Sequence, residues 1–279
     1  AAFSFGVPFG ASFNADERNA SMNILYLYQG GLTLGQKEYY LDTDKATVDI
    51  REAYKKHLIK MFQLFGFNAA QAKAKGEAVL RFETALAKFS KSSTELRDVE
   101  ANYNKMTFAQ FKAKYPNLPV EALLNAEGIK SAYFQTLVVG QPAFFAGLNK
   151  LVTTWNLADR KAYMQWSVIN SSTGYLSSAV EAEHFDFFGK TMRGKKENFP
   201  LWKRATSQVE SVMGEALGRI YCERFFPASS KTRMEELVKN LQVALAERIK
   251  DQDWMTHALE HALSAFYDIP HGAGLAIMH

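Results

Sequence analysis

The sequence predicts a mainly α-helical protein, and three observations favour this fold class. Long segments carry apolar residues at the three- and four-residue spacing of helices that face a core. Strand-like and helix-like segments do not alternate along the chain, as they do in proteins built around a parallel sheet. Apolar residues make up 47% and charged residues 22% of the 279 positions, which is ordinary for a soluble globular protein with a sizeable core.

The first 45 residues are rich in Gly, Phe, Ser and Asn, and we expect them to form an irregular N-terminal segment. Within it, a short strand is expected at Asn23–Tyr28, and the run Gln29-Gly30-Gly31-Leu32 is typical of a turn. We therefore predict three parts: the irregular segment 1–45, a helical domain 46–255 and a histidine-rich tail 256–279.

The helical pattern starts at Thr47, and Gly66 ends its first run. The apolar residues of that run are Val48, Ile50, Tyr54, Leu58, Met61, Phe62 and Phe65. Asn68 is suited to cap a second helix, because its side chain can accept a hydrogen bond from a backbone N–H of the first turn. The apolar stripe of this second helix is Ala74, Val79, Phe82, Leu86 and Phe89.

Six more helices are expected further along the chain. They cover Thr107–Tyr115, Val120–Asn125, Ala143–Trp155, Leu157–Ala179, Trp202–Phe226 and Lys231–Lys250. Between Gly189 and Pro200 lies a loop rich in Gly and Lys, which is the best internal break in the sequence.

Charge and cysteine content limit the classes of partner. The net charge of +4 is spread along the chain, and short clusters such as Arg193–Lys196 are typical of solvated helix faces, so no nucleic-acid partner is expected. No window reaches the 18 or more apolar residues of a transmembrane segment. The single cysteine, Cys222, excludes an intramolecular disulfide and lies in an apolar helical run, where we expect it to be buried.

Four of the six histidines lie in the last 23 residues, and two of them have the spacing of zinc ligands on a helix. His257 and His261 are one helical turn apart, with Glu260 beside the second, in the order H-x-x-E-H. A peptidase with this inverted motif needs a third ligand well downstream. His57 and His184 stand alone in the sequence, and each is expected to be a surface or satisfied core histidine.

The segment from about 253 to 279 resembles the metal-binding segment of iron-containing alcohol dehydrogenases, in the residues Asp253–His261 and Ser264–Gly272. The resemblance implies that His257 and His271, fourteen residues apart, bind a divalent metal such as iron, and that His261 lies near a nicotinamide cofactor. That family takes its other ligands from an earlier D-x-x-x-H, and it uses a Gly-rich phosphate-binding turn. Neither pattern occurs in this sequence ahead of the tail.

A second resemblance covers residues 13–255. Its first specific segment is Gln29–Leu41, in which a Gly-Leu turn leads to an acidic residue and Tyr-Tyr-Leu. Further segments follow in a fixed order: Glu83–Ala87, Arg97-Asp98, Asn102–Thr107, Phe185–Lys190, Trp202–Arg204, Gly214–Tyr221, and Phe225–Pro227 continuing through Arg248-Ile249 to Asp253–Met255. With these segments the chain resembles the N-terminal, largely helical part of neprilysin-family zinc endopeptidases, and most of all their bacterial PepO-type members.

This resemblance implies a helical domain that caps a thermolysin-like catalytic domain and encloses a cavity open to peptides. In that family an H-E-x-x-H helix and a downstream Glu hold zinc, and an Asn-Ala-aromatic segment binds the substrate backbone. No His-Glu pair and no Asn-Ala-aromatic run is present here. We therefore predict no catalytic residue in this chain, no stoichiometric zinc or iron, and no peptidase activity of the chain alone.

The leading hypothesis is thus a part of a zinc-dependent endopeptidase that hydrolyses peptides in an enclosed cavity, with a junction near Trp254. Its expected partners are peptides and a catalytic portion on another chain, and its expected location is bacterial, periplasmic or secreted. Two alternatives stay open: a fragment of an iron-containing, NAD(P)-dependent alcohol dehydrogenase, and a non-catalytic helical module that binds peptides. A helix over Lys231–Met255 that lacks its catalytic domain should expose apolar surface and promote self-association.

Overall fold

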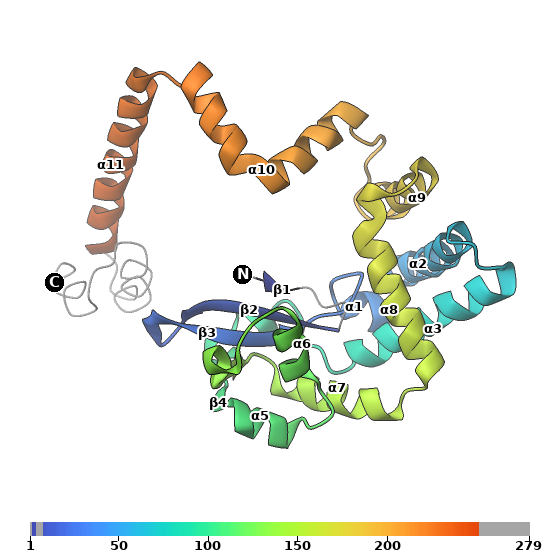
Figure 1. The fold of residues 1–279 in the computed structure, drawn as a ribbon. Helices are drawn as coiled ribbons and strands as arrows, with labels where there is room; N and C mark the ends of the chain where they lie inside the picture. The colour runs from blue at the N-terminus through green and yellow to red at the C-terminus, as the bar shows by residue number, and fades with distance from the viewer. Residues whose placement is uncertain (1, 4–7, 251–279) are drawn as a thin grey trace. The chain divides into compact units, whose positions relative to one another are not determined.

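The computed structural model describes residues 2–3 and 8–250 (Figure 1). They form a mainly helical protein with a small sheet, so the predicted fold class is confirmed. The chain divides into two compact units, 1–15 with 23–198 and 16–22 with 199–279. The boundary at residue 198 lies in the Gly- and Lys-rich loop that the sequence marks as its best internal break.

The sheet has five strands in the order β1-β2-β3-β5-β4. They are β1 (Ala2–Phe3), β2 (Phe9–Asp16), β3 (Asn19–Gln29), β4 (Lys105–Thr107) and β5 (Thr136–Val139). β1 is antiparallel to β2, and β4 is antiparallel to β5. β3 runs parallel to β5, with Leu25 opposite Leu137, so the connection between them contains the first six helices.

The first 45 residues contain more regular structure than the irregular segment predicted for them. β2 and β3 form a hairpin, with the expected strand at Asn23–Tyr28 inside β3, and a short helix α1 (Glu38–Leu41) follows. Burial along β2 does not alternate, because the adjacent residues Ala11 and Ser12 are both buried, so the sequence carries no clear strand pattern here. The hairpin is held by burial against the remaining sheet, which a local pattern does not reveal.

Helices α2 (Lys45–Leu64) and α3 (Ala69–Ala87) begin where the sequence predicts. The Asp44 side chain accepts a hydrogen bond from the N–H of Thr47 at the start of α2. At the start of α3, Asn68 and Gln71 form a reciprocal capping box. The two helices pack closely, because Gly76 on α3 leaves room for the α2 backbone.

Five α-helices and two 3-10 turns follow α3 in this unit, interrupted by the strands β4 and β5. They are η1 (Glu95–Arg97), α4 (Val99–Asn102), α5 (Phe108–Lys114), α6 (Val120–Ala126), η2 (Ser131–Phe134), α7 (Pro142–Thr154) and α8 (Leu157–Ser172). The helix expected over Leu157–Ala179 is broken after Ser172 by a 3-10 turn, η3 (Thr173–Tyr175). Helix α9 (Ser178–His184) then continues into a π-helix, η4 (Phe185–Thr191).

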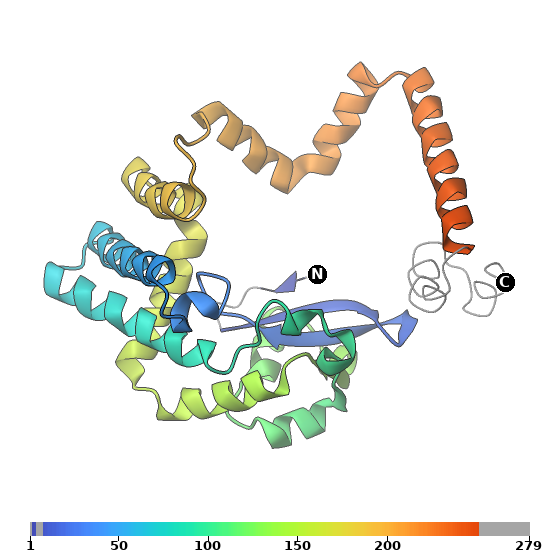
Figure 2. The same cartoon turned by 180° about the vertical axis from the view of Figure 1, so that it is seen from behind.

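Aromatic side chains join these helices to the sheet. In both views α7 runs along one side of the hairpin (Figures 1 and 2), and the ring of Phe145 on α7 lies 5.8 Å from that of Phe9 on β2. At the far end of the unit, α2, α3 and α8 pack together around Trp166, whose ring lies 6.2 Å from Tyr54 and 6.4 Å from Phe62. These large rings form part of the buried core of the unit.

The second unit contains the helices α10 (Leu201–Phe225) and α11 (Ala228–Lys250). Helix α10 is kinked at Met213, whose backbone is not helical, directly before Gly214. None of its 25 residues is buried against the described part of the chain. Cys222, expected to be a buried hydrophobe, is therefore exposed, because the apolar run that contains it is uncovered.

Candidate functional site

The residues predicted to bind metal or cofactor, His257, His261 and His271, lie outside the described residues, as does the junction near Trp254. Their roles stay predictions. Within residues 2–3 and 8–250, no group of three or more His, Cys, Asp and Glu side chains is placed to hold a metal ion. The polar groups that the structure does bring together fall into two buried clusters and one surface pocket.

The first cluster surrounds the carboxylate of Glu83, which is fully buried on α3. Glu83 accepts hydrogen bonds from the hydroxyls of Thr33 at 2.6 Å, Tyr40 at 2.8 Å and Tyr54 at 2.9 Å. The Tyr40 hydroxyl in turn accepts the backbone N–H of Leu34 at 3.0 Å. One carboxylate therefore ties the turn after β3 to α1, α2 and α3.

The turn itself is fixed from the other side by α8. The indole Nε1 of Trp166 donates to the Thr33 hydroxyl at 2.9 Å, and the Tyr163 hydroxyl donates to the carbonyl of Gly31 at 3.0 Å. Gly31 has a φ of +78°, and a Cβ there would lie 2.6 Å from both Pro8 and the Tyr163 hydroxyl. Only glycine satisfies both the backbone conformation and the space.

Burial raises the pKa of Glu83 to about 7, although its three hydroxyl donors act in the opposite direction. The buried carboxylate, in turn, helps to raise the pKa of Tyr40 and of Tyr54, for which burial is the larger cause. A carboxyl group with a pKa near neutrality is a candidate acid or base. Here it has no exposed surface and no free approach for a substrate, so its role is structural.

The sequence alone does not predict this cluster, although Gly31 and Tyr40 lie in one family-like segment and Glu83 lies in another. The signal was present: Glu83 lies on the apolar stripe of α3, between Phe82 and Leu86. A charged residue on a core-facing stripe needs buried hydrogen-bond partners.

The second cluster contains His57 and His184, each of which the sequence predicts to be a surface or satisfied core histidine. His57 on α2 is buried, and its Nδ1 lies 2.9 Å from a carboxylate oxygen of Glu183 on α9. The ring of His184 lies 6.4 Å from that of His57. The pKa of His184 is lowered to about 4, first by burial and then by the nearby His57 and Arg193. Two imidazoles and one carboxylate in this geometry form no metal-binding group.

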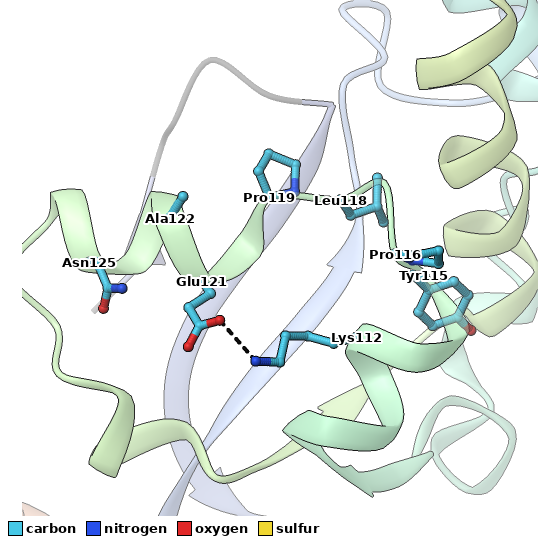
Figure 3. A pocket seen from close by; sticks show the side chains of 8 residues that line it. All are labelled: Lys112, Tyr115, Pro116, Leu118, Pro119, Glu121, Ala122 and Asn125. Atoms are coloured by element: carbon cyan, nitrogen blue, oxygen red, sulfur yellow. Dashed lines mark hydrogen bonds and ion pairs between the residues drawn. The ribbon is translucent and has the colours of Figure 1, made fainter.

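A surface pocket of about 500 Å³ lies between α5 and α6 (Figure 3). Its apolar wall is formed by Tyr115, Pro116, Leu118, Pro119 and Ala122. Lys112 and Glu121 face one another across it, with Nζ and the carboxylate 3.0 Å apart (Figure 3). Both side chains are about half exposed, so the pair is a weak surface salt bridge.

Comparison with known proteins decides the family. A sequence profile of peptidase family M13 matches residues 1–263. This chain belongs to peptidase family M13. The match to M13 confirms the resemblance to neprilysin-type enzymes, and it extends past the junction predicted near Trp254, so that His257 and His261 lie inside it.

Relatives in the M13 family come from animals and bacteria. The endothelin-converting enzyme homolog of Locusta migratoria is 26% identical over 264 residues, covering 91% of this chain and 36% of that protein. The crystal structure of the zinc metalloprotease Zmp1 of Mycobacterium tuberculosis with an inhibitor is 30% identical, covers 90% of this chain and 38% of its own, and superposes with a TM-score of 0.80. PepO of Lactobacillus rhamnosis has the same fold, with 19% identity, a TM-score of 0.77 and coverage of 90% of this chain and 39% of its own.

The chain thus spans a little over a third of these M13 relatives. The two family-like segments that meet at Glu83, Gln29–Leu41 and Glu83–Ala87, are explained by its hydrogen bonds, since they fix the turn, α1 and α3 to one another. The residues that the family resemblance highlights in this part of the chain are therefore structural.

Proposed function

We propose that this chain supplies the N-terminal helical part of a zinc-dependent endopeptidase that cleaves peptides inside an enclosed cavity. The observation that carries the proposal is the M13 match over residues 1–263. It is supported by 30% identity and a TM-score of 0.80 to Zmp1, which is itself a zinc metalloprotease.

The zinc chemistry belongs to residues other than the described ones. Catalytic zinc needs three protein ligands and an open position for water. The described residues provide no such set. One nitrogen of His57 is already hydrogen-bonded to a carboxylate oxygen of Glu183 at 2.9 Å. Nor does the sequence contain a His-Glu pair. The role proposed for this chain is to shape the cavity and position a catalytic domain.

The catalytic domain is also the partner proposed for the second unit. Helices α10 and α11 leave large apolar side chains exposed along their length, among them Leu201, Trp202, Val212, Leu217, Ile220, Phe225, Leu237, Leu241 and Leu245. Contiguous apolar surface of this extent marks an interface. The M13 relatives are nearly three times as long as the matched region, so the family contains the chain length needed to cover it.

The test uses a quenched fluorescent peptide, zinc and a chelator. We expect no chelator-sensitive cleavage by this chain alone, and cleavage when it is mixed with the separately produced portion of Zmp1 that lies outside the matched region. Cleavage by the chain alone that a chelator abolishes would show that it holds a complete zinc site and contradict the proposal.

A matched pair of variants tests the interface. Val212→Glu places a charge on the exposed apolar face of α10, where Val212 is 78% exposed, and should abolish complementation. Ser211→Glu adds the same charge at the neighbouring exposed position and should leave complementation unchanged. Equal effects of the two substitutions would place the contact elsewhere.

The compartment and the two alternative functions stay open. None of the helices in the described part of the chain is long and apolar enough to cross a membrane. A periplasmic or secreted location in a bacterium is proposed from the likeness to bacterial relatives, and cell fractionation tests it.

The alcohol-dehydrogenase alternative depends on His257, His261 and His271, and stoichiometric iron with NAD(P)-dependent alcohol oxidation would support it.

A further inference from the structure

The hairpin formed by β2 and β3 carries an asparagine at its exposed end. The two strands are joined by Glu17 and Arg18, and all residues from 17 to 23 are exposed. Asp16 closes the turn, since its carboxylate accepts the backbone N–H of Arg18 at 3.0 Å. Asn19 begins β3 directly after this turn. Its side chain therefore lies at a surface turn, where a modifying enzyme can approach.

Asn19, Ala20 and Ser21 form the tripeptide N-x-S, which is the acceptor sequence for N-linked glycosylation. In a strand, residues i and i+2 point to the same face. Asn19 and Ser21 accordingly lie side by side, and the Ser21 hydroxyl donates to Oδ1 of Asn19 at 2.7 Å. The amide nitrogen Nδ2 of Asn19 makes no hydrogen bond to another described residue. The amide and the hydroxyl that define an acceptor are thus presented together, with the nitrogen available.

The sequence contains one further tripeptide of this type, Asn170-Ser171-Ser172, and its geometry is different. It lies at the end of α8, and on a helix residues i and i+2 do not face each other. The amide oxygen Oδ1 of Asn170 is also buried, beside the core residue Ile169. A glycan on Asn170 would require its amide to leave this buried position. The second tripeptide therefore matches the acceptor sequence without the acceptor geometry.

We propose that Asn19 is the site of an N-linked glycan, and that Asn170 is not modified in the folded chain. The co-substrate is an oligosaccharide linked through pyrophosphate to a lipid, and the enzyme is an oligosaccharyl transferase. Nδ2 of Asn19 forms a bond to C1 of the first sugar while the bond from C1 to the pyrophosphate oxygen breaks. The lipid pyrophosphate leaves with the electron pair of that bond, and one proton of the amide nitrogen passes to a base on the transferase.

A glycan at Asn19 leaves the core unchanged. β5 pairs with β3 only from Leu25 to Leu27, and the buried residues of β3 begin at Ile24. The sugar therefore extends into solvent from a part of the strand that the core does not use. It adds a bulky, hydrophilic group near Met22, which is 59% exposed.

The inference rests on the periplasmic or secreted location proposed above, because N-linked glycans are typical of surface loops in secreted proteins. A reaction with purified components tests the acceptor site wherever the chain resides, and cell fractionation tests the location. The two can therefore fail separately, and neither result depends on whether the chain complements a catalytic domain.

The reaction contains the folded full chain, a purified oligosaccharyl transferase and a lipid-pyrophosphate-linked oligosaccharide. A short peptide with an N-x-S acceptor in the same tube shows that the transferase is active. Mass spectrometry of the digested chain should find the oligosaccharide on the peptide that contains Asn19, and none on the peptide that contains Asn170. An unmodified Asn19 beside a modified control peptide, or equal occupancy of the two asparagines, would overturn the proposal.

Variants of the two serines show whether the tripeptide determines the modification. Ser21→Ala removes the hydroxyl at an exposed position and should abolish modification of Asn19, whereas Ser21→Thr keeps a hydroxyl and should retain it. Ser172→Ala makes the same change in the second tripeptide and should leave the result unaltered. Modification of Asn19 that persists in Ser21→Ala would contradict the proposal. So would an unmodified Asn19 in chain recovered from the periplasm or the medium of its own cells.

Discussion

The helices of the first unit and those of the second have similar amphipathic sequences in different surroundings. In α2, the residues Tyr54, Leu58, Met61 and Phe62 are all buried beneath α3 and α8. In α10, Leu201 and Val212 are 71% and 78% exposed. The sequence nevertheless predicts helices in both units.

The two sets of helices differ in whether other described residues cover their apolar faces. An amphipathic helix gains little stability without a partner, because most helical stability comes from packing of the apolar face. The first unit encloses its own core, whereas α10 and α11 have their apolar faces open. Exposed apolar faces of this kind are typical of interfaces, and the M13 relatives are longer than this chain.

Separation of the units should give the largest effect. Residues 1–198 produced alone should unfold cooperatively, because their core is built from their own side chains. Residues 199–279 alone should show no cooperative thermal transition and should self-associate. Calorimetry and light scattering measure both properties. A monodisperse, cooperatively melting 199–279 would remove the contrast between the units.

Matched leucine substitutions sharpen the same contrast. Leu58→Ala removes a fully buried side chain on α2 and should lower the free energy of unfolding by about 2–5 kcal/mol. Leu241→Ala removes a side chain that is 61% exposed on α11 and should change it by less than about 0.5 kcal/mol. Leu241→Ala should reduce self-association instead. Urea denaturation with light scattering tests both outcomes, and equal losses of stability would contradict the assignment of two surroundings.

The buried carboxylate predicts a pH dependence specific to the first unit. The pKa of Glu83 is about 7 when folded and 4.5 when unfolded, so its contribution to stability is greatest below 4.5 and falls as pH rises to 7. The loss amounts to roughly 3 kcal/mol. Glu83→Gln should remove this slope, and Glu77→Gln, at a partly exposed position on the same helix where the carboxylate pairs with Lys55, should retain the slope between 4.5 and 7. Because His184 produces the opposite slope between 6.5 and 4, the difference between the chain and its Glu83→Gln variant is the quantity to compare.

Local patterns predicted the helices and missed the contacts between distant segments. The start of α3 was predictable because Asn68 and Gln71 lie within one turn. The pairing of Leu25 with Leu137 was not, since it joins strands more than a hundred residues apart and β5 has only four residues. The same reason applies to His57 and Glu183, which are 126 residues apart and carry no shared pattern.

The predictability of helix starts leads to the smallest of the expected effects. Asn68 and Ser177 both precede helices and are both good capping residues by type, but only Asn68 makes the hydrogen bonds of a cap. Asn68→Ala should therefore lower the free energy of unfolding by about 1 kcal/mol, and Ser177→Ala by a few tenths at most. Urea denaturation of the two variants shows whether the residue type or the observed hydrogen bonds determine how much a capping residue stabilises the chain. If Ser177→Ala costs as much as Asn68→Ala, capping at the start of α9 is stronger than its contacts indicate.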